Sequence, residues 1–107
     1  MFARILEFTP QMEKKDEFVK VVKNQILPIL KKQSGFLDIL PLIPETRNEK
    51  VIAISLWTEK KDLEKYERNV YPEVLQILKP FLLTPIDVKP YLVETTLCEH
   101  FMNALVA

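Results

Sequence analysis

The side chains best suited to chemistry are aromatic and polar groups beside apolar segments. Trp57, the only tryptophan, ends the apolar segment 50–58, and Ser55 shares its face of that segment. Tyr66 and Tyr71 follow in the next helical segment. An indole and two phenol rings can line a pocket for a flat aromatic ligand, and they can equally fill a hydrophobic core. The residue types leave both interpretations open, and one tryptophan can serve both.

A single cationic residue, Arg4, interrupts the apolar segment 2–8. A guanidinium buried in such a segment needs an anionic partner. We expect Arg4 to pair with Asp38 or Glu7 across the sheet, or else to hold an anionic ligand. No catalytic residue can be assigned, so the predicted ligand pocket is defined by five residues: Trp57, Tyr66, Tyr71, Arg4 and Ser55.

The sequence CEH places the only cysteine, Cys98, two residues before the only histidine, His100. A zinc site would need two further ligands that the sequence does not indicate, and a nucleophilic cysteine would need an oriented base. The only glycine, Gly35, excludes the glycine-rich loops that bind nucleotides. The sequence therefore predicts no metal and no cofactor.

Composition limits the partners of the chain. Its 107 residues carry 15 basic and 15 acidic side chains, so the formal net charge is zero. We expect neither nucleic acid nor an anionic membrane surface as a partner. One cysteine allows no internal disulfide, and no apolar run is long enough to span a bilayer. A cytoplasmic protein is the prediction.

The apolar pattern predicts the order strand, helix, strand, strand, helix, strand. This is an α+β, ferredoxin-like βαββαβ domain, with a four-stranded antiparallel sheet and helices on one face. We assign it to residues 1–96, and a helical tail to 97–107. The expected strands are residues 2–8, 36–44, 50–58 and 86–96.

Local signals set the expected helix ends. Thr9 and Thr58 are candidate N-caps. Pro28 and Pro72 should interrupt the two helical regions, because proline removes a backbone donor. Gly35 should provide a left-handed C-cap for the first helix.

The expected strand 50–58 is apolar on both faces, which predicts a homodimer. Ile52, Ile54 and Leu56 lie on one face and Trp57 lies on the other. Two helices can cover only one face of the sheet, so a second copy of the chain is the simplest cover for the other.

Three stretches resemble the antibiotic biosynthesis monooxygenase superfamily of dimeric α/β barrels. They are KKQSGFLD at 31–38, ISLWTEKKDLEKYE at 54–67 and YPEVLQILKPFL at 71–82. The resemblance runs over residues 2–96. It implies a dimeric, cofactor-independent monooxygenase for a small aromatic or phenolic compound, whose anion reacts with oxygen in an apolar pocket. Trp57 matches the family tryptophan at the end of the third strand.

Two departures from that family pattern keep a second hypothesis open. The asparagine that precedes the tryptophan by four positions in quinone-forming members is Ala53 here. The second helix offers Glu67, Arg68 and Asn69 but not the histidine of haem-degrading members. The alternative is therefore a non-catalytic dimeric ligand-binding or interaction module of the same fold.

Overall fold

The computed structural model describes residues 1–46 and 49–97 of the chain. The strands are β1 (Phe2–Phe8), β2 (Phe36–Leu42), β3 (Val51–Trp57) and β4 (Asp87–Leu92). The helices are α1 (Lys15–Val21), α2 (Leu27–Lys31), α3 (Lys60–Asn69) and α4 (Tyr71–Leu78). A π-helical turn (Val22–Ile26) joins α1 to α2, and short 3-10 turns occupy Met12–Lys14, Lys79–Phe81 and Thr95–Leu97.

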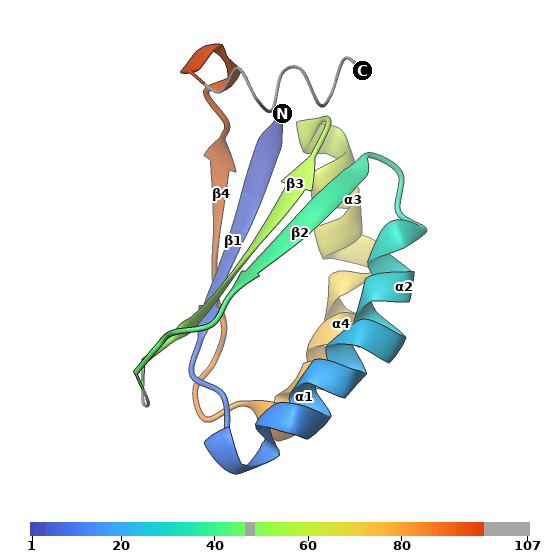
Figure 1. Cartoon of the computed structure of the whole chain (residues 1–107). Coiled ribbons are helices and arrows are strands. Elements are labelled where there is room, and N and C mark those ends of the chain that lie inside the picture. Colours follow the sequence, from blue (N-terminus) through green and yellow to red (C-terminus); the bar gives the residue numbers. More distant parts are fainter. Residues whose placement is uncertain (47–48, 98–107) are drawn as a thin grey trace.

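The four strands form one antiparallel sheet in the order β2-β3-β1-β4. The helices α1 to α4 pack on the same face of this sheet, and within residues 1–46 and 49–97 none of them lies on the other face (Figure 1). The predicted α+β, ferredoxin-like architecture is therefore confirmed. The position of β2 at the edge of the sheet explains how the strand tolerates Pro41, because an edge strand needs fewer backbone donors.

Strand alternation assigns each side chain to one face of the sheet. Phe2 pairs with Trp57 and Arg4 pairs with Ser55, and these positions face the helices. Ile5 pairs with Ile54 on the open face. The core lies between sheet and helices and consists of Phe8, Phe18, Ile26, Leu30, Val51, Trp57, Leu63, Tyr66, Val74, Leu78 and Phe81.

Both predicted proline interruptions are confirmed. Pro28 cannot donate to a carbonyl in the preceding turn, and the helix widens there, so that the Leu27 N–H bonds to the Val22 carbonyl five residues back. Pro72 lies in the first turn of α4, directly after α3 ends.

The two predicted N-caps are wrong. The segment after Thr9 pairs with the chain near residue 82 instead of starting a helix: Pro10 bridges Leu82, and the Leu83 N–H bonds to the Thr9 carbonyl at 2.9 Å. The first helical turn follows Gln11.

At the second helix the cap position is Glu59, one residue later than predicted. The Thr58 N–H bonds to the Gly35 carbonyl at 2.9 Å. Gly35 has φ +79°, which confirms its predicted left-handed conformation. The hydrogen bond between Thr58 and Gly35 therefore joins the residue before β2 to the segment that leads into α3.

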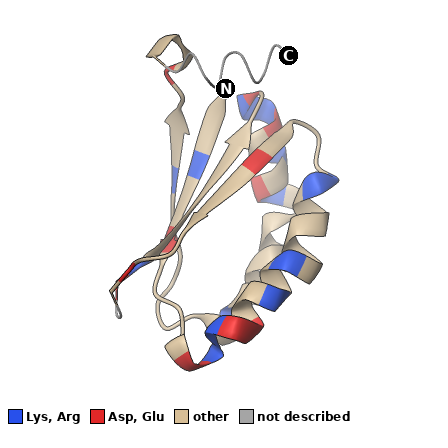
Figure 2. Cartoon of the chain, in the orientation of Figure 1, with Lys and Arg blue, Asp and Glu red and all other residues tan. Residues whose placement is uncertain are grey.

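The described part of the chain ends at Leu97, so Cys98, His100 and most of the predicted tail lie outside it. Within residues 1–46 and 49–97, no helix is both long and apolar enough to cross a membrane. Charged residues are spread along the helices, whereas the strands are mostly uncharged (Figure 2).

Candidate functional site

Trp57 lies in the core between the sheet and α3. Its side chain has no exposed surface. Its ring meets Phe36 edge-on, with centroids 5.5 Å apart, and stacks at a tilt on Tyr66, with centroids 5.0 Å apart. The indole Nε1–H donates to Ser55 Oγ at 3.0 Å, and the Ser55 hydroxyl donates to the Arg4 carbonyl at 3.4 Å. Trp57 and Ser55 are therefore linked by hydrogen bonds to the backbone of Arg4.

Arg4 extends from β1 into the same aromatic cluster and is only 2% exposed. Its Nε–H donates to Glu67 Oε1 on α3 at 2.8 Å, which makes a charge-assisted hydrogen bond. The guanidinium carbon lies 4.0 Å from the ring centroid of Tyr71 and 5.4 Å from that of Tyr66. Both rings therefore add cation–π attraction to the ion pair.

The predicted partners of Arg4 were wrong for a geometric reason. Arg4 occupies an even position of β1 and faces the helices, whereas Glu7 occupies an odd position and faces away from them. Asp38 pairs with Leu56 on the same open face as Glu7. Glu67, the observed partner of Arg4, was not predicted from the sequence, although it follows the buried Leu63 by one helical turn and so faces the sheet.

The two terminal nitrogens of Arg4 form no hydrogen bond within the described residues. Within residues 1–46 and 49–97, Arg4 makes one side-chain hydrogen bond, through Nε. The same residues contain no fully buried side-chain polar atom without a partner, so the two Nη atoms keep a small contact with solvent although the Arg4 side chain is only 3% exposed. Each Nη carries N–H donors arranged to bind an anionic oxygen.

Tyr66 stays protonated in this environment. Burial raises the pKa of its phenol to about 12, although the neighbouring Arg4 charge acts in the opposite direction. At neutral pH, Tyr66 is therefore an uncharged donor. The positive charge of Arg4 is met by Glu67 alone among the described groups that touch it.

An apolar cavity of about 430 Å³ opens beside Tyr71, between α4 and β4. The Tyr71 side chain borders this cavity and also stacks on Arg4, so it connects the charged group to an apolar space. The other lining residues are Leu75, Lys79, Leu82, Leu83, Thr84, Pro85, Ile86 and Val88. The five residues of the predicted pocket thus form one cluster, and of these Tyr71 alone borders this cavity.

Metal ligands do not gather near this cluster. Across the described residues, no group of three or more His, Cys, Asp or Glu side chains is placed to hold a metal ion. The chemistry that the cluster offers is a cation, two phenols and apolar walls.

The chain belongs to the antibiotic biosynthesis monooxygenase family, whose sequence model matches residues 1–76. This match covers β1 to most of α4, and so it includes all five residues of the aromatic cluster. A comparison with curated proteins found no match.

Solved structures share the fold at low sequence identity. A protein from Nitrosomonas europaea that bears the same family name has a TM-score of 0.71 and 12% identity, over 88% of this chain and 99% of that one. SnoaB from Streptomyces nogalater, described as a cofactor-independent oxygenase, has a TM-score of 0.67 and 14% identity, over 91% and 96%. A conserved protein from Methanosarcina mazei has a TM-score of 0.68 and 20% identity, over 85% and 91%.

Proposed function

We propose that the chain is a cofactor-independent monooxygenase that oxidises a small phenolic compound as its anion. The observation that carries this proposal is Arg4, a buried cation stacked on the tyrosine that borders an apolar cavity, whose Nη donors form no hydrogen bond within residues 1–46 and 49–97. A cation in a site of low polarity lowers the pKa of a bound phenol, because it favours the charged form. The family and the similarity to SnoaB support the same reaction class.

The reaction needs no external reductant. The phenolate supplies electrons to O2, one oxygen atom forms the new carbonyl of a quinone, and the other leaves as water. The phenol C–H and O–H hydrogens both go to that water, so atoms and electrons balance. In this scheme the Tyr71 ring moves aside so that the phenolate oxygen reaches Arg4, which does not itself line the cavity. The apolar lining of the cavity reduces the contact of the reactive anion with bulk water.

A non-catalytic role remains the second candidate, and one observation favours it. The space around Trp57 is filled by Phe36, Tyr66 and Ser55, so the indole cannot stack on a ligand without rearrangement. Ala53 also lacks the polar side chain that quinone-forming members have at this position. A dimeric module that binds a phenol without oxidising it would keep the same Arg4 contacts.

The oligomeric form belongs to the same proposal: we infer a homodimer through the open face of the sheet. Ile5, Ile52, Ile54 and Leu56 form its half-buried centre. Leu40 and Tyr91, on the flanking strands, are 53% and 49% exposed. A second copy would cover this apolar strip, which is costly to leave in water. We also place the protein in the cytoplasm, because a chain with one cysteine cannot form the internal disulfides that are typical of proteins in oxidising compartments.

Oxygen uptake tests the reaction. Purified protein is incubated with dihydroxynaphthalenes, and oxygen consumption and quinone absorbance are recorded together. We expect equal molar amounts of O2 consumed and quinone formed, and a loss of at least tenfold in Arg4→Met, with partial activity in Arg4→Lys. Phenol binding without oxygen uptake would replace the oxygenase by the binding module.

A further inference from the structure

The end of the Arg4 side chain offers more donors than the protein uses. A guanidinium carries five N–H donors in one plane, one on Nε and two on each Nη. Glu67 accepts the Nε donor through one oxygen at 2.8 Å. The donors on both Nη atoms of this buried cation are without a partner in the described part of the chain, and both atoms keep a small contact with solvent.

The way in which Glu67 binds Arg4 decides which donors are left. A carboxylate can bind a guanidinium along two edges, through Nε and one Nη or through both Nη atoms, with two parallel hydrogen bonds in each case. Glu67 makes a single bond, to Nε, so the edge formed by both Nη atoms has no described partner. Tyr71 lies against the flat face of the guanidinium, with its ring centroid 4.0 Å from Cζ. When the Tyr71 ring moves aside, the bond to Glu67 still orients the group.

An edge of two coplanar N–H groups favours a particular arrangement of acceptors. It matches two oxygen atoms that are held side by side in one plane, as in carboxylates and phosphates. Two oxygens on neighbouring carbons of an aromatic ring have the same arrangement. In the monoanion of such a diol, the remaining hydroxyl hydrogen points at the phenolate oxygen, so both oxygens can accept from Arg4. A diol whose oxygens lie far apart offers this edge only one of them.

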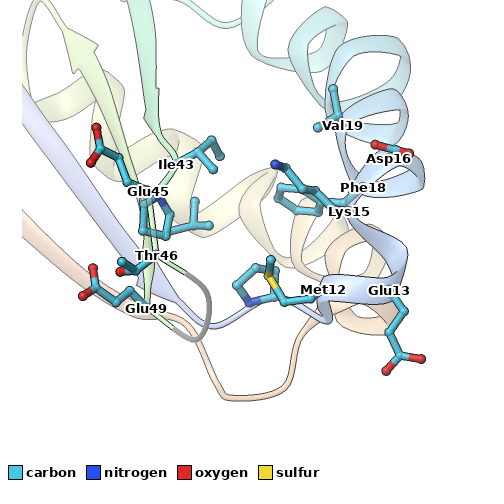
Figure 3. Close-up of a pocket in the computed structure, with 13 residues that line it drawn as sticks. Met12, Glu13, Lys15, Asp16, Phe18, Val19, Ile43, Glu45, Thr46 and Glu49 are labelled. Atoms are coloured by element: carbon cyan, nitrogen blue, oxygen red, sulfur yellow. The ribbon is translucent and has the colours of Figure 1, made fainter.

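The position of Arg4 also decides which cavity such a ligand enters. Tyr71, which stacks on Arg4, borders the cavity of about 430 Å³ between α4 and β4. A larger cavity, of about 650 Å³, lies between α1 and the segment that follows β2 (Figure 3). It shares no lining residue with the first cavity, and its lining flanks residues 47–48, which lie outside the described part of the chain. We therefore assign no ligand to the larger cavity.

We propose, as a refinement of the proposed function on which it rests, that the substrate carries two oxygen atoms on neighbouring ring carbons. Arg4 binds both oxygens through its two Nη atoms, and the apolar ring system lies in the cavity beside Tyr71. Glu67 is a positioning residue, because it acts on the substrate only through its bond to Arg4 Nε. The volume of the cavity lies within the usual range for small-molecule sites, about 300–1,000 Å³.

Two isomers of one diol test the proposal. Affinities of 2,3-dihydroxynaphthalene and 2,6-dihydroxynaphthalene for the full chain are measured by isothermal titration calorimetry under nitrogen, which prevents oxidation. We expect the native chain to bind the 2,3 isomer roughly tenfold more tightly, because it gains one further charge-assisted hydrogen bond. In Arg4→Lys this preference should fall below about threefold, because lysine keeps the charge but has no planar pair of donors. Differences in acidity and hydration between the isomers are the same for both chains and cancel when the two preferences are compared.

Variants of Glu67 test its positioning role. Glu67→Ala removes the partner of Nε and should lower the preference for the 2,3 isomer by about threefold, whereas Glu67→Gln keeps an oxygen that can accept from Nε and should retain it. Glu64→Ala, at an exposed position of the same helix, is the control and should bind both isomers as the native chain does. Circular dichroism reports whether each variant is folded. A role of Glu67 in stability alone would leave the preference unchanged in Glu67→Ala and contradict the assignment.

The outcomes separate the two-oxygen contact from the proposed reaction. Equal affinity for the isomers in the native chain, the same preference in Arg4→Lys, or no binding of either isomer overturns the contact. If Arg4→Lys does not fold, an unchanged preference in Glu67→Ala overturns it instead. Equal affinity together with oxygen uptake on both isomers leaves the proposed function standing without this contact. Selective binding of 2,3-dihydroxynaphthalene with no oxygen uptake in air supports the contact and refutes the oxygenase.

Discussion

The hydrogen bond between Ser55 and Trp57 has a measurable effect on stability. Ser55 is 4% exposed and Trp57 has no exposed surface, and their bond is 3.0 Å long. In Ser55→Ala, the indole N–H stays buried without an acceptor, at a cost of about 1–3 kcal/mol. The second bond of Ser55, to the Arg4 carbonyl, is 3.4 Å long and contributes little. We therefore expect Ser55→Ala to lower the free energy of unfolding by about 2 kcal/mol.

Urea unfolding followed by far-ultraviolet circular dichroism measures this loss, and a double-mutant cycle assigns it. In a Trp57→Phe background the unpaired N–H no longer exists, so Ser55→Ala should cost less than about 0.5 kcal/mol. Ser34→Ala is the matched control, because Ser34 is exposed and should change stability by no more than about 0.5 kcal/mol. The reasoning is refuted if Ser55→Ala is as mild as Ser34→Ala, or if its cost is the same with phenylalanine at position 57.

Three further perturbations test the surroundings of this bond. Glu67→Gln removes the negative charge that pairs with Arg4 and should lower the free energy of urea unfolding by about 1 kcal/mol. The loss is small because the Glu67 side chain is 37% exposed and solvent screens part of the interaction. No change in stability would mean that Arg4 needs no counter-charge. The raised pKa of Tyr66, about 12 against about 10 unfolded, gives stability that is present below about pH 10 and is lost as the pH rises towards 12. Unfolding at about pH 9 and about pH 11.5 should show a fall about 2 kcal/mol larger in the native chain than in Tyr66→Phe, and equal falls would contradict the burial of the phenol. Gly35→Ala should cost about 1–3 kcal/mol in the same assay, because φ is positive there and the new methyl group would collide with the Asp62 side chain. Gly35→Ala/Asp62→Ala removes the carboxylate but keeps the Asp62 Cβ position, so it should recover only part of the loss, and full recovery would contradict the backbone strain.

The elements that follow from short-range rules were predictable. The apolar run 2–8 became β1 without a shift at either end, and 50–58 became β3 with one residue removed at each end. Pro28 and Pro72 interrupted the helices because a missing backbone donor acts wherever proline lies. These features depend on residues a few positions apart.

The errors arose where distant residues compete with local signals. Thr9 is a suitable N-cap in isolation. In the structure, however, its carbonyl accepts a hydrogen bond from the Leu83 N–H, and the neighbouring Pro10 forms a β-bridge with Leu82. Glu67 was missed as the partner of Arg4, although alternation along β1 already places Arg4 and Glu7 on opposite faces. The cavity beside Tyr71 could not be foreseen, because it depends on how the single stretch of residues 71–88 turns back on itself between α4 and β4.

The central claim is that Arg4 binds a phenol as its anion, and the absorbance of a bound phenol tests it most directly. Naphthol is added at a pH slightly below the pKa of the free compound, where it is mostly neutral, and its near-ultraviolet spectrum is recorded during titration with the protein under nitrogen. We expect the phenolate band to grow with the native chain and not with Arg4→Met. Naphthol that binds with the spectrum of the neutral phenol, or a phenolate band of equal size in Arg4→Met, would contradict the account.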